Sequence, residues 1–145
     1  MIKEIESRRS IRRYKDIPVK KELIEEILKA GMLAPSSKNR QPWHFIVTTG
    51  SAKEQVLKAM EAGLKREEKQ PFLPESAPYL DGARATLKIM KEAPVIIFIT
   101  DPLASPMDQP LAIDERVSEI CNAQSMGAAI ENMTLAATEL GLGSL

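Results

Sequence analysis

Only two segments of this chain have the pattern of a β-strand, and both lie between segments that have a helical pattern. Residues 43–49, WHFIVTT, form a short apolar run that is rich in β-formers. Residues 94–100, PVIIFIT, are apolar at successive positions, which predicts a strand that is buried on both faces and central in its sheet. Two strands are too few to support a sheet with helices packed around it.

Four helices are predicted around these strands, over residues 20–34, 51 to about 67, 80–92 and 114–140. The first has apolar residues at helical spacing and stops before Pro35. Ser51 and Glu54 are spaced as a capping box, in which each side chain binds an unpaired amide at the start of the second helix. Residues 70–78 carry three prolines, which predicts a loop or lid between the second and third helices.

The last predicted helix has an unusual composition. Small residues occur along it together with large apolar ones: Ala123, Gly127, Ala128, Ala129, Ala136 and Ala137, among Val117, Ile120, Ile130, Met133 and Leu140. Because small side chains let another backbone approach closely, we expect a central core helix that is buried on most sides. Packing against a symmetry mate is compatible with that prediction.

The small number of strands also bears on the length of the protein. The sequence stops at Leu145, just after Gly141 and Gly143 end the long helix. We therefore expect the 145-residue sequence to be a fragment of a longer reading frame, with further strands after Leu145.

The composition predicts one ordinary globular domain over residues 1–145, with 43% hydrophobic and 28% charged residues. Twenty acidic residues balance twenty basic ones, so nothing indicates a nucleic-acid or membrane partner. Cys121 is the only cysteine, which excludes an internal disulfide and favours the cytoplasm. No apolar run approaches the length of a bilayer span.

Most catalytic constellations are missing from the sequence. His44 is the only histidine and no GxSxG motif occurs, which argues against a Ser-His-Asp hydrolase. One histidine and one cysteine do not make the usual zinc or iron site, so we expect no metal. We expect His44 at the surface of a strand edge and Cys121 packed and inert. GLGS, residues 141–144, follows a helix instead of a strand, so it is predicted to be a helix C-cap and not a dinucleotide fingerprint.

The segment SRRSIRRYKD, residues 7–16, concentrates four arginines in a chain of zero net charge. Guanidinium groups, a hydroxyl and backbone amides between two helices supply the charge-assisted donors that a phosphate monoester requires. The alternative is a solvated basic loop.

The segment APSSKNRQPWHF, residues 34–45, presents neutral polar side chains after Pro35 has stopped a helix. Such donors and acceptors beside a phosphate clamp suit a large planar heterocycle with a polyol arm. The alternative is ordinary turn chemistry, because Ser, Asn and Pro are turn residues.

Together the two segments are more specific than either alone. RRSIRRY, followed about twenty residues later by APSSKNRQPW, resembles the FMN-dependent nitroreductase family, and PVIIFIT and the long helix ending in GLGS look like it too. The resemblance implies an α+β fold in which a mixed, mainly antiparallel sheet is surrounded by helices. It also implies an obligate homodimer, with the long helix and two FMN sites at the subunit interface. Family members continue past GLGS with a further strand, a late basic residue and a tail that wraps the partner.

The resemblance also implies roles for single residues. Arg8, Arg9 and Ser10 would hold the FMN phosphate and ribityl chain, and Arg12 would reach the pyrimidine edge of the flavin. In the second segment, the residues that would come from the partner subunit are Pro35, Ser36, Ser37 and Asn39. Gly143 and Ser144 would pass the isoalloxazine ring by backbone contact. Gln41 and Trp43 would support the loop, and Arg13 would be a surface charge.

The implied reaction uses FMN as cofactor and NAD(P)H as reductant, in a ping-pong cycle with nitroaromatic, quinone or flavin acceptors. No catalytic acid or base is expected, because stacking and distance account for most of a hydride transfer. A cation such as Arg12 at the pyrimidine edge would stabilise the reduced flavin.

Two alternatives remain open from the sequence. One is a specialised branch of the same superfamily, such as a reductive dehalogenase or a flavin-modifying enzyme, for which residues 65–82 are the only candidate lid. The other is a flavin- or nucleotide-binding module without turnover.

Overall fold

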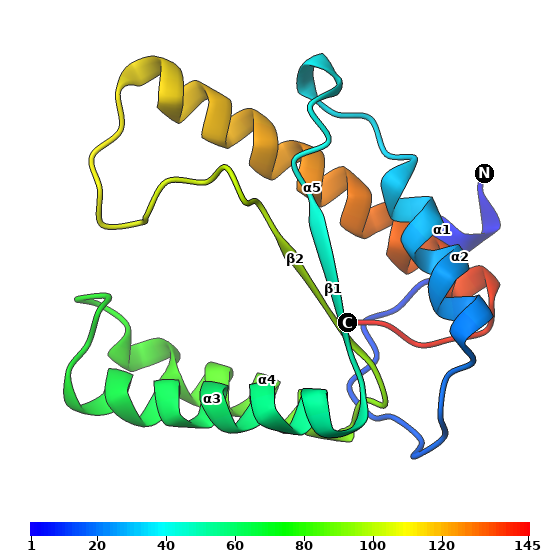
Figure 1. Ribbon diagram of the computed structural model, residues 1–145. Coiled ribbons are helices and arrows are strands. Elements are labelled where there is room, and N and C mark those ends of the chain that lie inside the picture. Colours follow the sequence, from blue (N-terminus) through cyan, green and yellow to red (C-terminus); the bar gives the residue numbers. More distant parts are fainter. The chain divides into compact units, whose positions relative to one another are not determined.

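The structure is a computed structural model that describes all residues 1–145, and it divides into two compact units. The first unit contains Met1–Ile11, Lys20–Ile46 and Ile97–Leu145, and the second contains Arg12–Val19 and Val47–Ile96. Along the chain the elements are α1 (Lys3–Ser7), α2 (Lys21–Met32), the 3-10 turn η1 (Ser37–Asn39), β1 (His44–Thr48), α3 (Gly50–Lys69), the 3-10 turn η2 (Ala77–Tyr79), α4 (Leu80–Glu92), β2 (Ile96–Thr100) and α5 (Ile113–Glu139) (Figure 1). No helix is both long enough and apolar enough to cross a membrane.

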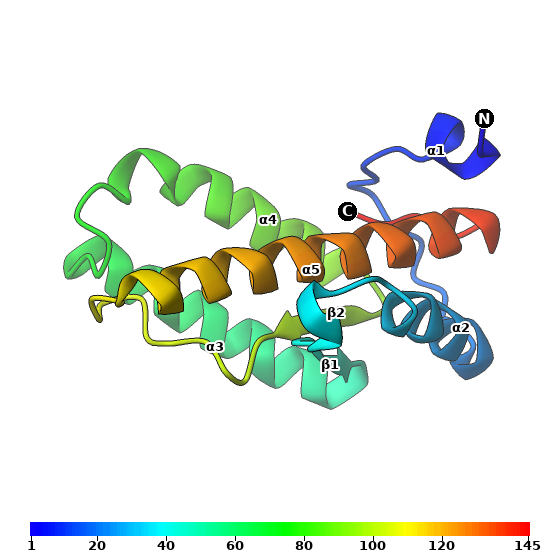
Figure 2. The same ribbon diagram turned by 90° about the horizontal axis from the view of Figure 1, so that it is seen from above.

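The first unit is built on α5, against which α2 and α1 pack (Figure 2). Its buried cluster is formed by Ile27 of α2 with Met133 and Ala137 of α5. Phe45, Ile97 and Ile99 of the two strands pack against that cluster, so α5 holds both α2 and the sheet. In addition, Asn132 Nδ2 donates a 3.2 Å hydrogen bond to the carbonyl of Ala30, which fixes the last turn of α2 on α5.

At Gly31, α2 lies close to α5. A Cβ atom on Gly31 would lie 2.8 Å from Met133 Cγ, 2.9 Å from Met133 Sδ and 3.0 Å from Phe45 Cζ. A Cβ atom at this position would force the side chains of Met133 on α5 and Phe45 on β1 to shift.

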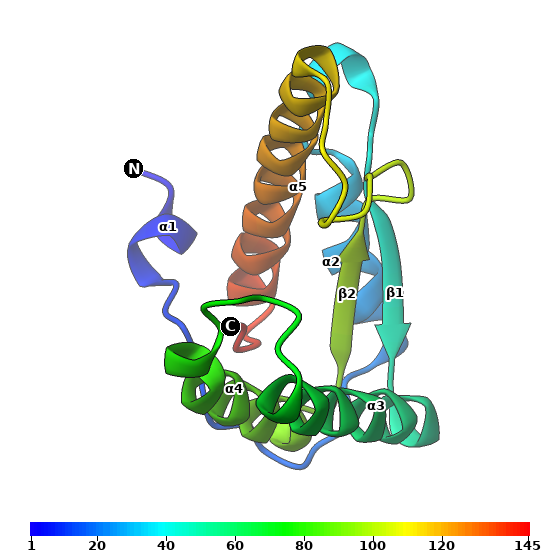
Figure 3. The same cartoon turned by 90° about the vertical axis from the view of Figure 1, so that its left-hand side faces the viewer.

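In the second unit, α3 and α4 pack side by side and are joined by the proline-rich loop and η2 (Figure 3). Leu57 of α3 and Leu87 of α4 are buried. Lys53 Nζ donates to the carbonyl of Ala93 at 2.6 Å and to that of Lys91 at 3.2 Å. A cation bound to carbonyls at the end of α4 stabilises that helix terminus.

The two strands form an antiparallel pair (Figure 3). Thr48 Oγ1 donates to the carbonyl of Ile96 at 3.2 Å, and Thr100 Oγ1 donates to the carbonyl of His44 at 3.5 Å. The start of each strand therefore lies beside the end of the other. A single parallel bridge between Ser10 and Ser144 is found outside the sheet.

The predicted α+β class and the order of the elements are confirmed. The helix predicted over residues 80–92 has the predicted bounds, and those predicted over 20–34 and 114–140 are found as Lys21–Met32 and Ile113–Glu139. The strands predicted over residues 43–49 and 94–100 are found as His44–Thr48 and Ile96–Thr100. His44 is exposed at the start of β1, as expected.

The predicted capping box of Ser51 and Glu54 is wrong. The helix begins one residue earlier, at Gly50, with Thr49 as N-cap and without a side-chain hydrogen bond at the cap. Ser51 is therefore inside the first turn, past the position from which a hydroxyl reaches the unpaired amides.

Two expectations about burial are also wrong for this chain. β2 pairs with β1 alone, and a sheet of two strands has no central position. The buried residues of α5 lie on one face: Asn122, Ser125, Ala129, Met133 and Ala137. Val117 and Ile120 are 54% and 50% exposed, so α5 presents an apolar face that nothing in the chain covers.

The close approach at Gly31 generates a prediction about stability. We expect Gly31→Ala to destabilise the protein by about 1 kcal/mol, because overpacking costs about 1–3 kcal/mol and the gain in helix propensity returns about 1 kcal/mol. Gly82→Ala on α4 is the matched control, since a Cβ atom there meets nothing within 4 Å. We expect this control to stabilise the protein by about 0.5–1 kcal/mol. Urea unfolding measures both, and a Gly31→Ala protein as stable as the parent would contradict the packing described.

Candidate functional site

The N-terminal arginine segment and the end of the chain lie side by side. Ser10 and Ser144 form a parallel bridge, and the Ile11 amide donates a 2.9 Å hydrogen bond to the carbonyl of Ser144. Residues more than 130 positions apart in the sequence are therefore brought into one short pairing. Three of the predicted site residues, Ser10, Gly143 and Ser144, meet here.

The turn after α5 directs the chain into this pairing. Gly141 has a φ of +74°, its amide donates to the carbonyl of Thr138 at 3.0 Å, and the Leu142 amide donates to that of Ala137 at 2.8 Å. These two hydrogen bonds define a Schellman motif, which needs a residue in the left-handed region after the last helical turn. Leu142 packs against the buried cluster, as is typical of the motif. The predicted helix C-cap at GLGS is confirmed.

Gly143 allows the chain end to lie close to residues 10–11. A Cβ atom on Gly143 would lie 2.9 Å from Ile11 Cγ2 and 3.0 Å from Ile11 Cγ1. The absence of a side chain lets the backbone of residues 143–144 lie directly on the segment that carries the arginines.

Arg8 and Arg9 lie just before this pairing, at the end of α1. Arg9 Nη1 donates 2.7 Å hydrogen bonds to the carbonyls of Glu6 and Arg8, which are among the unpaired carbonyls of the helix end. Arg8 Nε lies 3.7 Å from Glu131 Oε1 of α5, with the two side chains 33% and 55% exposed. An ion pair that exposed is weak, so it does not hold the Arg8 side chain in place and leaves it able to turn toward an anion.

Arg12 belongs to the second unit and not to the first. It is followed by Arg13, whose side chain is 85% exposed and pairs with Glu92 at 3.3 Å. Arg13 is thus the surface charge that the sequence predicts. Burial raises the pKa of the next residue, Tyr14.

The second predicted segment forms a strained loop between α2 and β1. Lys38, Asn39 and Gln41 have φ values of +54°, +52° and +49°, which residues with a side chain adopt rarely. Such strain costs of the order of 1–3 kcal/mol per residue and is kept where surrounding contacts enforce it.

Hydrogen bonds hold this loop in its conformation. Ser36 Oγ accepts the Gln41 amide at 2.9 Å, and the Ser37 amide donates to Ser125 Oγ of α5 at 3.2 Å. Trp43 stacks on Phe45 with ring centroids 6.3 Å apart. The supporting role predicted for Gln41 and Trp43 agrees with these contacts. Pro35 and Asn39 are exposed, and the Asn39 side chain has no hydrogen bond.

The structure does not bring the two segments together within one chain. The loop at residues 36–41 is attached to α5 through Ser125, whereas residues 143–144 follow the end of that helix at Glu139 (Figure 1). Between Ser125 and Glu139 the helix axis advances by about 20 Å, at about 1.5 Å per residue. The candidate site therefore consists of two separate groups of residues on one helix.

A cavity of about 270 Å³ lies between the loop and the first turns of α5. It is lined by Ser37, Lys38, Arg40, Asp114, Val117, Ser118 and Cys121. Sequence reasoning did not single out Lys38 and Arg40, which line this cavity. The signal that could have found them is the placement of two cations at alternate positions inside a segment of neutral polar residues. Cys121, expected to be packed, is only partly buried and lines this cavity.

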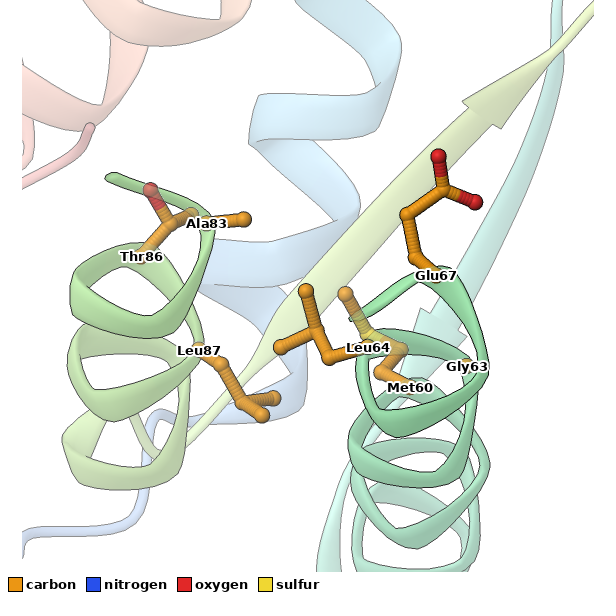
Figure 4. A pocket seen from close by; sticks show the side chains of 7 residues that line it. All are labelled: Met60, Gly63, Leu64, Glu67, Ala83, Thr86 and Leu87. Carbon is orange, nitrogen blue, oxygen red and sulfur yellow. The ribbon is translucent and has the colours of Figure 1, made fainter. Parts of the chain in front are cut away.

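A second cavity, of about 350 Å³, lies between α3 and α4 and is mostly apolar (Figure 4). Met60, Leu64 and Leu87 line it, and Glu67 stands at its rim. The Phe72 and Leu73 amides donate to the Glu67 carboxylate at 3.0 and 3.1 Å, which lowers the pKa of Glu67. Because that carboxylate is ionised and occupied by the loop, it is a poor proton donor.

Comparison with known proteins relates the whole chain to one family. The profile of the Nitroreductase family matches residues 5–145. Two archaeal proteins that both bear the name "Putative NADH dehydrogenase/NAD(P)H nitroreductase" are similar to it. The one from Methanothermobacter thermautotrophicus is 33% identical over 100% of this chain and 59% of its own length. The one from Archaeoglobus fulgidus is 35% identical over 99% of this chain and 64% of its own length. The chain thus spans about three fifths of the length of these relatives.

The fold is also similar to that of solved nitroreductase structures. The crystal structure of a "putative nitroreductase in complex with fmn" from Desulfovibrio desulfuricans matches 97% of this chain and 63% of that chain, with a TM-score of 0.63 and 32% identity. The nitroreductase-like fold expected from the sequence is confirmed.

The pairing of the chain end with the arginine segment generates a second prediction. In Gly143→Ala, the new methyl group collides with Ile11, so we expect the Ile11 amide to lose its hydrogen bond to Ser144 and to exchange with deuterium at least tenfold faster. Gly82→Ala is the control, since a Cβ atom there meets nothing within 4 Å. Unchanged protection of Ile11 in Gly143→Ala would refute the close pairing.

Proposed function

Because this chain belongs to the nitroreductase family, we propose that it carries the FMN-binding core of an NAD(P)H-dependent flavin oxidoreductase. The observation that carries the proposal is the pairing of Ser10 with Ser144 beside two arginines. It sets cationic and backbone donors next to each other at the surface, in a family for which an FMN complex is known.

The residues of the first group fit an FMN phosphate by their chemistry. Arg8 and Arg9 supply guanidinium donors, which bind a phosphate oxygen pair in bidentate fashion, and Ser10 supplies a hydroxyl. Arg8 lies beside Glu131 in a weak, exposed ion pair, and the carbonyls at the end of α1 bind Arg9. In this proposal these three residues hold the phosphate and ribityl chain.

The paired backbone beside them fits a flat ring. The side of Gly143 on which a Cβ atom would stand is filled by Ile11, so a planar ring would lie against another side of the 143–144 backbone. We assign Gly143 and Ser144 to the isoalloxazine ring through backbone contact. Arg12 keeps its role at the pyrimidine edge as part of the proposal, where a fixed cation favours the negative charge of the reduced flavin.

The second group fits a role in a partner subunit. The loop residues Pro35, Ser36, Ser37 and Asn39 are attached to α5 about 20 Å from its end. They reach a flavin at the arginine segment if a second copy of the chain presents them. Ser36 can still donate its hydroxyl proton, and Asn39 presents an unpaired amide, so both can bind the polar edges of a heterocycle.

The exposed face of α5 supports a homodimer. Ile113, Val117 and Ile120 are 80%, 54% and 50% exposed and lie at helical spacing on that face, and Gly127 follows them two turns later. An apolar stripe with a small residue in it suits close packing against a second helix. We propose that two copies of α5 meet there, so that each flavin lies between subunits.

In this proposal the residues of the chain position the flavin and stabilise its charge, and no side chain has to act as an acid or a base. When bound, FMN would accept a hydride from NAD(P)H and pass reducing equivalents to a nitroaromatic, quinone or flavin acceptor. The task of Arg8, Arg9 and Ser10 is to fix the phosphate end, and that of the 143–144 backbone is to fix the ring plane. Orientation of that kind contributes much of the rate of a transfer between stacked rings.

The phosphate assignment gives a direct test. We expect Arg8→Ala to lower FMN affinity by about tenfold or more, because a hydrogen bond to a charged group is worth about 1.5–3 kcal/mol. Arg13→Ala removes an equal charge from an exposed side chain that pairs with Glu92, and should leave FMN affinity within about twofold. Equilibrium titration of the deflavinated protein, followed by flavin fluorescence, measures both constants. Equal FMN affinity for Arg8→Ala and the parent protein, at equal thermal stability, would overturn the phosphate clamp.

A further inference from the structure

The cavity beside the strained loop is lined by cationic and hydroxyl side chains. Two of its lining side chains, Lys38 and Arg40, are cations that belong to the loop, and Ser37 and Ser118 add hydroxyl groups. Its volume is about 270 Å³. A cavity of roughly 150 Å³ already holds benzene, so this one has room for a substituted aromatic ring or a phosphate-sized group, but not for a whole dinucleotide.

The two cations are not neutralised by the protein. Neither Lys38 nor Arg40 forms an ion pair in the structure, whereas cations such as Arg13 and Arg84 do. The one acidic side chain of the cavity, Asp114, forms no ion pair either. The cavity therefore has two positive charges against one negative charge, in a chain whose net charge is zero.

The loop conformation holds the backbone of these two residues in place. Lys38 has a φ of +54°, and the Arg40 amide donates to the carbonyl of Ser37 at 3.1 Å. Ser37 in turn is bound to Ser125 of α5 at 3.2 Å. Strain of this kind persists only where the surrounding contacts enforce it and is concentrated at functional sites. It costs stability to hold a lysine in this conformation, and no contact within the chain requires a cation there.

We propose that Lys38 and Arg40, with Ser37 and Ser118, form an anion subsite that binds the carboxylate or phosphate of a substrate. The inference rests on the proposed function, because it assigns the subsite to one of the two substrates of the flavin reaction. Two sources supply such a group: a carboxylated aromatic acceptor, or the 2′-phosphate that distinguishes NADPH from NADH. The subsite is separate from the phosphate clamp proposed at Arg8, since the residues differ and the cavity-lining residues of α5 precede Glu131 by at least ten positions, about 15 Å along the helix.

The position of Val117 connects the subsite to the flavin. Val117 lines the cavity and is also part of the exposed α5 stripe that we assign to the dimer contact. The neighbouring loop residues Ser37 and Asn39 are those assigned to the partner's flavin. An anion bound by Lys38 and Arg40 would thus be held at the border of the interface, beside the loop that contacts the cofactor.

The test compares two double variants with the same loss of charge. Lys38→Gln with Arg40→Gln removes both cations of the cavity. Lys58→Gln with Lys88→Gln is the control, because both of these lysines are exposed, outside the cavity and without an ion pair. Thermal unfolding of each protein shows that the fold is retained.

The first arm needs neither FMN nor turnover. Benzoate and its neutral analogue benzamide are titrated into the 145-residue chain at low ionic strength, and the backbone amides are followed by NMR. We expect benzoate, and not benzamide, to shift the amides of Lys38, Arg40 and Ser118 in the parent and control proteins. The cavity variant should bind benzoate at least tenfold more weakly. Absence of these shifts in the parent, or equal binding by the cavity variant, overturns the proposal.

The second arm identifies the source of the anion in the FMN-loaded protein. The KM ratio of 4-nitrobenzoate to nitrobenzene reports on the acceptor, and that of NADPH to NADH reports on the reductant. We expect one of the two ratios to rise about tenfold in the cavity variant and neither to change in the control. If both ratios stay unchanged, the subsite does not serve the substrates and the proposal is wrong. If the protein neither binds FMN nor turns over, the proposed function fails, and the NMR titration alone decides the subsite.

Discussion

The contact between Gly31 of α2 and Met133 of α5 is the interaction on which the first unit depends. With no side chain at Gly31, the two helices approach closely enough for Phe45 of β1 to reach the same point. The buried cluster of Ile27, Met133 and Ala137 surrounds that contact and gathers both strands onto α5. Since close-packed interiors respond to single methyl groups, the positions of the loop, the strands and the chain end all depend on the close approach of Gly31 to Met133.

This arrangement places two groups of polar residues at different positions along α5. The end of the helix, through its Schellman turn, returns the backbone to the arginine segment, where guanidinium groups and an exposed backbone lie together. Near its middle, Ser125 anchors a strained loop that carries neutral donors and two unpaired cations. Because α5 has apolar residues on two faces, it can bury one face in its own chain and offer the other to a second copy. A dimer formed in this way would bring the arginine segment of one subunit near the loop of the other.

The sequence was sufficient for what depends on local patterns. Apolar spacing located α2, α4 and α5, and the glycines after residue 140 located the helix C-cap. What depends on distant residues was not predictable. Ser51 does not cap α3 because the helix begins one residue earlier, at Gly50. The burial of α5 on one face depends on which other elements pack against that helix. Likewise, Lys38 and Arg40 look like solvated turn residues until the first turns of α5 are placed beside them. The roles assigned to Arg8, Ser36 and Asn39 came from a family motif, and they remain predictions.

The measurement that tests the account most directly is FMN stoichiometry in mixed dimers. One subunit carries Arg8→Ala and the other Ser36→Ala with Asn39→Ala, and two affinity tags isolate the heterodimer. If each flavin lies between subunits, one site has all the lesions and the other is intact. At an FMN concentration that fills the intact site but not the weakened ones, the heterodimer therefore binds one FMN, whereas the homodimer of either variant binds almost none. A heterodimer without bound FMN would show that both groups serve the same chain's flavin and would contradict the account.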